Sequence, residues 1–315
     1  MRASQEPAFQ GACHLVLFGD CEILQDRAAD LGMRFDFERL SSQDLLAGAP
    51  IPERAVVHVA ARKDEIVPGR GSKASGDAAA NNVIECAVAC REGRLDAIVT
   101  APLSKVFLRE AGYPYPGHTE LLAHLAGGVP VAMAFLTERL KVVLATIHVP
   151  LRNAIEQITE ALILEKLEIL LREFPRLGLP CKRVAVAGVN PHAGEGGLLG
   201  REEIELIQPA IQRARQLHPD LRIDGPVPAD TLFYRAAHGE FDAVLALFHD
   251  QGLSPIKLIG FGEAVNVTLG LPFVRTSVDH GTAFDIAGKG IARHESMVSA
   301  IRWALRLVHP AVSPK

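Results

Sequence analysis

The sequence predicts an α/β fold, because short apolar runs typical of strands alternate along the chain with longer amphipathic segments typical of helices. The chain has 315 residues, of which 48% are hydrophobic and 22% are charged. This length suggests about two domains or one large α/β unit, and the composition is that of a globular protein with a sizeable core. We therefore expect helical layers around a largely parallel sheet.

The order of the expected elements follows from the hydrophobic periodicity of the chain. Strands are expected at residues 14–19, 55–59 and 97–100. Helices are expected at residues 22–31, 76–92, 158–174, 202–217 and 296–308. Residues 69–75 (GRGSKAS) are expected to form a flexible surface loop, since Gly and Ser favour irregular backbone.

Charge and cysteine usage argue against several classes of protein. The net charge is −4 and there is no long basic run, so neither nucleic acid nor an anionic membrane is an expected partner. The five cysteines are irregularly spaced, which favours a reducing compartment over a disulfide framework. We expect neither a transmembrane helix nor a signal peptide, and therefore a cytoplasmic enzyme.

Three histidines stand at or just after apolar runs that read as buried strands: His148, His192 and His249. Ligands of open α/β sheets bind outside the carboxyl ends of the strands. Three imidazoles delivered to that edge would suit a divalent metal. The alternative is that each histidine caps its own strand end and the three never meet.

Two further motifs indicate anion binding. Lys105 follows the strand expected at residues 97–100 and could reach an anion or carry a proton, although most such lysines are simply solvated. Residues 117–120 (GHTE) open a helical pattern, where free N–H groups and the helix dipole favour a phosphate or carboxylate. The alternative there is that Thr119 is an ordinary N-cap.

The segment around His192 is rich in glycine but does not match the dinucleotide-binding fingerprint. Leu199 occupies the position of the third glycine, and the first strand–helix unit supplies no fingerprint either. A nicotinamide cofactor would therefore have to bind in another way.

The C-terminal third carries a group of polar residues within apolar surroundings. Asp250 could orient an imidazole or act as a general base. Lys257, Asn266 and Arg275 would form a clamp for a phosphate ester and a carboxylate. The alternative, that they are solvated surface residues, is weakened by their apolar neighbours.

These segments together resemble the 4-hydroxythreonine-4-phosphate dehydrogenase family of pyridoxal phosphate biosynthesis, from about residue 14 to the C-terminus. Six motifs occur in the family's order: TAPLSK (100–105), GHTE (117–120), IHVPL (147–151), GVNPHAGEGGLLGREE (188–203), HDQGLSPIK (249–257) and NVTLGLPFVRTSVDHGTAFDIAG (266–288). Relatives that oxidise four-carbon aldonate phosphates share most of these motifs, and a more distant branch acts on a cyclohexadiene diol dicarboxylate.

The resemblance implies an isocitrate/isopropylmalate dehydrogenase-like fold, with two α/β lobes around a cleft. We expect residues 1–117 and 276–315 to form the first lobe, and residues 118–275 the second, with the metal and dimer contacts. The implied cofactors are NAD, with NADP as the alternative, and a divalent metal (Zn, Co, Mg or Mn). The resemblance implies a homodimer with a shared site, in which the metal ligands are His148, His192 and His249, the third from the partner subunit.

The implied reaction oxidises 4-phosphohydroxy-L-threonine to a 3-oxo acid that decarboxylates to 3-amino-2-oxopropyl phosphate. D-threonate or D-erythronate 4-phosphate is the alternative substrate. The residues that match substrate-contacting positions are His118, Thr119, Lys257, Asn266 and Arg275. The candidates for proton transfer are Lys105, Asp250 and Lys257. A three-histidine metallohydrolase is a weaker alternative, because it does not explain the Lys–Asn–Arg clamp.

The chain departs from the family pattern at its start. Residues 1–13 stand where the family has a strand and a Gly-Asp-Pro-Ala-Gly-Ile-Gly-Pro-Glu-like segment. We expect either a start site placed too late or a truncated paralogue, which could be an inactive binding relative. Loss of the first βα unit would uncover apolar sheet surface at about 25 cal/mol per Å².

Overall fold

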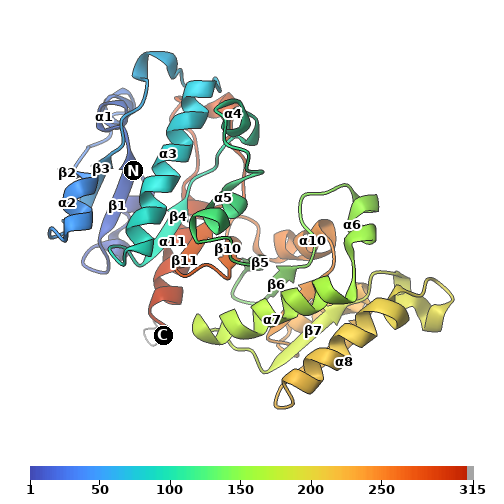
Figure 1. Cartoon of the computed structure of the whole chain (residues 1–315). Helices are drawn as coiled ribbons and strands as arrows, with labels where there is room; N and C mark the ends of the chain where they lie inside the picture. Colours follow the sequence, from blue (N-terminus) through green and yellow to red (C-terminus); the bar gives the residue numbers. More distant parts are fainter. Residues whose placement is uncertain (311–315) are drawn as a thin grey trace. The chain divides into compact units, whose positions relative to one another are not determined.

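The computed structural model describes residues 1–310 as a mixed α/β protein with two compact units (Figure 1). Unit 1 comprises Met1–Val129 and Leu271–Leu305, and the described part of unit 2 comprises Pro130–Gly270 and residues 306–310. The chain thus passes between units after Val129, Gly270 and Leu305, whereas we expected the boundaries after residues 117 and 275. Helix α5 (His118–Leu125) belongs to unit 1, because it packs against α3 (Lys73–Arg91). Residues 311–315, which the expected first lobe included, lie outside the described residues.

Unit 1 contains the strands expected near the N-terminus. Three strands form a parallel sheet in the order β1-β3-β2, namely Leu15–Gly19, Arg54–His58 and Glu38–Leu40. A further parallel pair joins β4 (Ala97–Thr100) to β11 (Val274–Ser277). The remaining α-helices of unit 1 are α1 (Cys21–Asp30), α2 (Ser42–Ala47), α4 (Lys105–Glu110) and α11 (Glu295–Val308).

Helix α3 begins earlier than the sequence pattern indicated. Its first residue is Lys73, so part of the segment expected as a flexible loop is helical. A capping box fixes this start: Ser75 N–H donates to Ser72 Oγ at 3.1 Å, and Ser72 N–H donates to Ser75 Oγ at 2.9 Å. The expectation for residues 69–75 was therefore wrong at its C-terminal end, because it weighed the glycines and overlooked this pair of serines.

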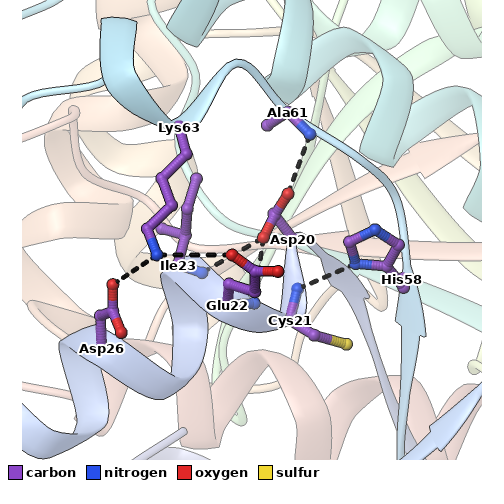
Figure 2. A network of polar contacts seen from close by, with 8 residues as sticks. All are labelled: Asp20, Cys21, Glu22, Ile23, Asp26, His58, Ala61 and Lys63. Carbon is purple, nitrogen blue, oxygen red and sulfur yellow. Dashed lines mark hydrogen bonds and ion pairs between the residues drawn. The ribbon is translucent and has the colours of Figure 1, made fainter.

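Asp20 joins two strand ends of unit 1, as Figure 2 shows. One oxygen of its carboxylate caps α1 by accepting the N–H groups of Glu22 and Ile23, and the other accepts Ala61 N–H at 3.0 Å. Burial raises the pKa of Asp20, but these three backbone donors outweigh it and hold the pKa below its usual value. The segment that follows β3 is thereby attached to the start of α1.

The N-terminal segment packs into the core of unit 1. It forms two short 3₁₀ turns, Ala3–Gln5 and Pro7–Phe9. Ala3 and Phe9 are buried in one apolar cluster with residues of α11, against which Leu15 and Val99 also pack. The loss of a first βα unit was expected to leave apolar surface uncovered. In the structure, the N-terminal turns add the buried side chains of Ala3 and Phe9 to the core of unit 1.

Unit 2 is built on six adjacent strands in the order β10-β5-β6-β9-β7-β8. Their bounds, in chain order, are Ala132–Leu136 (β5), Lys141–Leu144 (β6), Arg183–Ala187 (β7), Arg222–Val227 (β8), Ala243–Ala246 (β9) and Val265–Leu269 (β10). Strands β10, β5 and β6 pair antiparallel, and β6, β9, β7 and β8 pair parallel. The carboxyl ends of β6, β9 and β7 therefore lie side by side.

The α-helices of unit 2 are α6 (Leu151–Gln157), α7 (Glu160–Arg176), α8 (Gln208–Leu217), α9 (Ala229–Ala237) and α10 (His249–Gly260). The helix expected at residues 202–217 is divided into a π-helical turn, Glu203–Ile207, and α8. Helix α10 lies very close to the sheet at Gly252. A Cβ atom there would stand 2.6 Å from the Leu144 side chain.

Two further expectations concern membranes and cysteines. Across residues 1–310, no helix is both long and apolar enough to cross a membrane. All five cysteines of the chain are free thiols.

We predict that Phe9→Ala lowers the free energy of unfolding of unit 1 by about 3–5 kcal/mol, the cost of removing a buried phenyl ring. Phe9 is 3% exposed. The single tryptophan, Trp303, lies in α11, so urea unfolding followed by its fluorescence reports on unit 1. Val67→Ala, at an exposed position of the same unit, should change the value by less than about 0.5 kcal/mol. Equal effects of the two substitutions would show that the N-terminal turns do not contribute to the core.

Candidate functional site

Two of the three histidines approach each other at the carboxyl edge of the unit 2 sheet. The rings of His148 and His249 lie 5.3 Å apart between centroids. Neither residue is in a strand, however, because β6 ends at Leu144 and β9 ends at Ala246. His148 follows β6 in a connecting segment, and His249 is the first residue of α10.

His192 lies in an irregular loop after β7, on a backbone of unusual conformation. Six consecutive residues, 192–197, have positive φ values, including 50° at His192, 52° at Ala193 and 44° at Glu195. A left-handed backbone conformation costs each non-glycine residue on the order of 1–2 kcal/mol, and it persists only where the surrounding structure imposes it. The side chain of His192 is consequently presented to solvent at the outside of a strained turn.

Glu203 supplies the interactions that hold the start of this loop. Its side chain is almost fully buried, with 1% relative exposure. Oε1 accepts the N–H groups of Val189 and Asn190 at 2.8 and 2.7 Å, and Oε2 accepts from Asn190 Nδ2 at 2.9 Å. A buried carboxylate with three such donors is well satisfied and fixes the backbone that leads to His192.

The imidazole of His249 contacts the carboxylate of its neighbour Asp250. His249 Nδ1 lies 2.7 Å from Asp250 Oδ1, a geometry that leaves Nε2 as the nitrogen with a lone pair in the neutral ring. The described residues of a single chain bring no three His, Cys, Asp or Glu side chains together as a metal-binding group. Imidazole nitrogens such as those of His148 and His249 are of a ligand type that suits a divalent cation.

A second group of predicted residues gathers in unit 1 around Arg275. This arginine belongs to β11, is 3% exposed, and donates from Nη2 to Thr100 Oγ1 at 2.7 Å. His118 and the buried Thr119 begin α5, whose N-cap is Gly117, so the alternative that Thr119 is an ordinary N-cap is wrong. The reason is that Gly117 already has the non-helical backbone of the cap position, and Thr119 is the second residue of the helix.

The charges of this group are set by burial. Burial, with a contribution from the Arg275 guanidinium, lowers the pKa of His118 to about 3. Burial lowers the pKa of Arg275 to about 10, with the Glu120 carboxylate opposing the shift. At neutral pH the group is thus one permanent cation beside an uncharged imidazole. Such a group can bind an anion through the guanidinium and hydrogen-bond a neutral part of a ligand through the ring.

The remaining predicted residues are spread over both units. Lys105 is the first residue of α4 and is exposed, with its Cε 3.6 Å from where a Cβ on Gly117 would lie. Lys257 is an exposed residue of α10, and Asn266 is a half-buried residue of β10. Asp250 is 86% exposed. Unit 1 therefore brings Lys105 to the start of α5, and unit 2 brings Asp250 to His249.

Sequence reasoning missed the residues that support these side chains. Glu203, Thr100 and Gln251 all stood inside or beside recognised motifs but received no role. Thr100 ends a strand next to β11, so the pairing of those two strands was the missing information. For Glu203, an acidic residue shortly after a glycine-rich loop is a usable signal, because such loops need acceptors for their backbone N–H groups.

We predict that His118 stays uncharged from pH 8 down to at least pH 5, because its folded pKa of about 3 lies far below the ordinary value of 6.5. The unfolded chain takes up a proton at this residue as pH falls below 6.5 and the folded chain does not. The contribution of the uncharged His118 to the free energy of unfolding is therefore fully present above pH 6.5, and it declines as the pH falls below 6.5. Ring ¹⁵N shifts, assigned with His118→Gln, check the charge.

The exposed His124 of the same helix provides the matched control variant, His124→Gln. The acid-side loss of stability should also become shallower in His118→Gln and not in His124→Gln. A His118 ring that titrates near pH 6.5 would contradict the proposed burial effect.

Comparisons with known proteins place the chain in a family. The model of the family described as pyridoxal phosphate biosynthetic protein PdxA matches residues 11–304. The 4-hydroxythreonine-4-phosphate dehydrogenase of Methylococcus capsulatus is 43% identical over 307 residues, which cover 96% of this chain and 91% of that protein. The D-threonate 4-phosphate dehydrogenase of Cupriavidus necator is 41% identical over 288 residues, which cover 86% of each.

The structural comparison agrees. A crystal structure of 4-hydroxythreonine-4-phosphate dehydrogenase from Klebsiella pneumoniae has a TM-score of 0.83 and 41% identity, covering 93% of this chain and 90% of that one. The expected α/β fold of the isocitrate/isopropylmalate dehydrogenase type is thereby confirmed. The family model and these relatives show that the chain belongs to the PdxA family.

Proposed function

We propose that the protein is an NAD-dependent, divalent-metal-dependent dehydrogenase that oxidises 4-phosphohydroxy-L-threonine to a 3-oxo acid, which decarboxylates to 3-amino-2-oxopropyl phosphate. The observation that carries the proposal is that a chain of this family presents the imidazoles of His148 and His249 at one sheet edge, from which each would contribute to a site shared with the partner subunit. The anion-binding group around Arg275 supports a phosphorylated acid as substrate. NADP in place of NAD is a secondary proposal. A cytoplasmic location stays a prediction.

The candidate residues would divide into metal ligands, substrate contacts and a residue that orients one of the ligands. His148, His192 and His249 would hold the metal, which when bound supplies Lewis-acid polarisation of the substrate hydroxyl. Arg275 would bind an anionic group of the substrate, with His118, Thr119, Lys257 and Asn266 as further contacts. Asp250 would orient His249, because its carboxylate already accepts from that ring.

Proton transfer is then assigned to a lysine. Of the three candidates, Asp250 is engaged with His249, which leaves Lys105 and Lys257 as the groups that would carry the proton. An ammonium must lose its proton before it can act as a base, so whichever lysine acts would have to be uncharged in the substrate complex.

We also propose that the active form is a homodimer with a shared site. The surface around α9 and α10 exposes large apolar side chains, including Tyr234, Leu258 and Phe261 at 68%, 88% and 77%. Tyr234 and Leu258 line a hollow of about 680 Å³ that Asp250 and Gln251 also line. An exposed apolar patch of this kind is typical of an interface, and here it reaches the residue next to His249.

The reaction is tested with the purified protein and 4-phosphohydroxy-L-threonine, NAD and Zn²⁺, Co²⁺, Mg²⁺ or Mn²⁺ in separate assays. We expect NADH absorbance to rise with at least one metal and to disappear when a chelator removes it. D-threonate and D-erythronate 4-phosphate are assayed in parallel, and a higher kcat/KM for either would reassign the substrate. Phosphate release without NAD would identify a hydrolase, and no nicotinamide reduction with any substrate would refute the proposal.

The shared site is tested by mixing two inactive variants. His192→Ala and His249→Ala should each lose metal and turnover while remaining folded dimers. In a two-fold symmetric dimer, a heterodimer of the two variants regains one intact site, so refolding an equal mixture should restore about a quarter of the sites. If all three ligands came from one chain, the mixture would stay inactive.

A further inference from the structure

The inference concerns Gln251, a half-buried residue in the first turn of α10, two residues after His249. Its carboxamide makes two hydrogen bonds to backbone groups of different strands. Oε1 accepts Leu247 N–H at 2.7 Å, just after β9. Nε2 donates to the Gly188 carbonyl oxygen at 2.7 Å, just after β7.

These bonds replace a missing part of the sheet ladder. Strands β7 and β9 are paired as far as Val186 and Leu245. Two residues further along the same register, Gly188 and Leu247 would lie opposite each other, yet they are joined through the side chain of Gln251. The carboxamide therefore acts as a rung at the point where the two strand ends separate.

Further hydrogen bonds extend this connection toward β6 and toward the His192 loop. Toward β6, Thr146 donates from Oγ1 to the Leu247 carbonyl oxygen at 2.8 Å. Toward the His192 loop, Val189 and its neighbour are held by Glu203. His148 follows Thr146 by two positions and His249 follows Leu247 by two. All three segments that carry the histidines are thus connected, and Gln251 is the connection between the β9 and β7 segments.

We propose that Gln251 is a positioning residue that sets the distance between the His192 loop and the segment that carries His148, to which Leu247 is bonded through Thr146, and thereby the affinity of the site for a divalent metal. This inference rests on the proposed function, in which the three histidines are the ligands. The chemistry requires an amide: a carboxylate cannot donate to Gly188, and an aliphatic side chain provides neither bond.

The test compares Gln251→Glu and Gln251→Leu with the parent protein. Gln212→Leu is the control, because Gln212 is an exposed residue of α8 in the same unit. Zn²⁺ and Co²⁺ affinities are measured by competition with a chromophoric chelator, and the dimer is verified by sedimentation. We expect both Gln251 variants to bind metal about 10–100-fold more weakly, the usual effect of losing a group that supports a metal ligand, and Gln212→Leu to be unchanged.

Two further readouts separate positioning from general damage. The visible spectrum of bound Co²⁺ should shift in both Gln251 variants, since it reports ligand geometry. Amide hydrogen exchange at Leu247 should accelerate in Gln251→Leu and stay slow in Gln251→Glu, which keeps the acceptor. Faster exchange throughout β7 and β9 would mean lost stability and would overturn the positioning role.

The outcomes distinguish this inference from the proposed function. If the parent protein binds metal and both Gln251 variants bind it equally well, the positioning role is wrong while the metal site stands. If the parent protein binds no divalent metal at all, the proposed site fails and this inference fails with it.

Discussion

The parallel pairing of β6, β9 and β7 is the constraint on which the candidate site depends. Parallel neighbours deliver their carboxyl ends to the same edge, so segments that are 101 residues apart, at Thr146 and Leu247, are hydrogen-bonded there. The antiparallel hairpin of β5 and β6 is part of this constraint. It reverses the chain so that β6 runs alongside β9, and without it His148 would emerge at the opposite edge.

The sequence predicted which segments carry the histidines, but not where the strands before them end. The apolar runs continue to residues 148 and 249, whereas the ladders stop at Leu144 and Ala246. Hydrophobicity reports burial, and Ala145, Thr146 and Leu247 are still buried although they lie beyond the last strand residues. Whether a buried residue lies in a strand or in a following turn is decided by its hydrogen-bond partners, which are distant in the sequence.

The backbone conformation of the His192 loop and the charges of the group around Arg275 were harder still to predict from the sequence. Nothing in the residue types of Ala193 and Glu195 indicates their left-handed backbone, and the buried Glu203 that holds the start of this loop lies outside it in the sequence. The apolar surroundings of Arg275 did indicate burial. The uncharged state of His118 follows from burial together with that guanidinium, which approaches it through the pairing of β11 with β4. Local patterns therefore predicted the candidate side chains, and long-range strand pairing determined their burial and charge.

The left-handed run at residues 192–197 also bears on how this site can change over evolution. Gly194, Gly196 and Gly197 adopt positive φ, and a Cβ on Gly194 would lie 2.7 Å from the Glu203 carboxylate. Most single substitutions in this stretch would therefore be rejected before their effect on catalysis could matter. New substrate preferences should arise instead from segments with ordinary backbone geometry, which can vary while the loop that presents His192 stays the same.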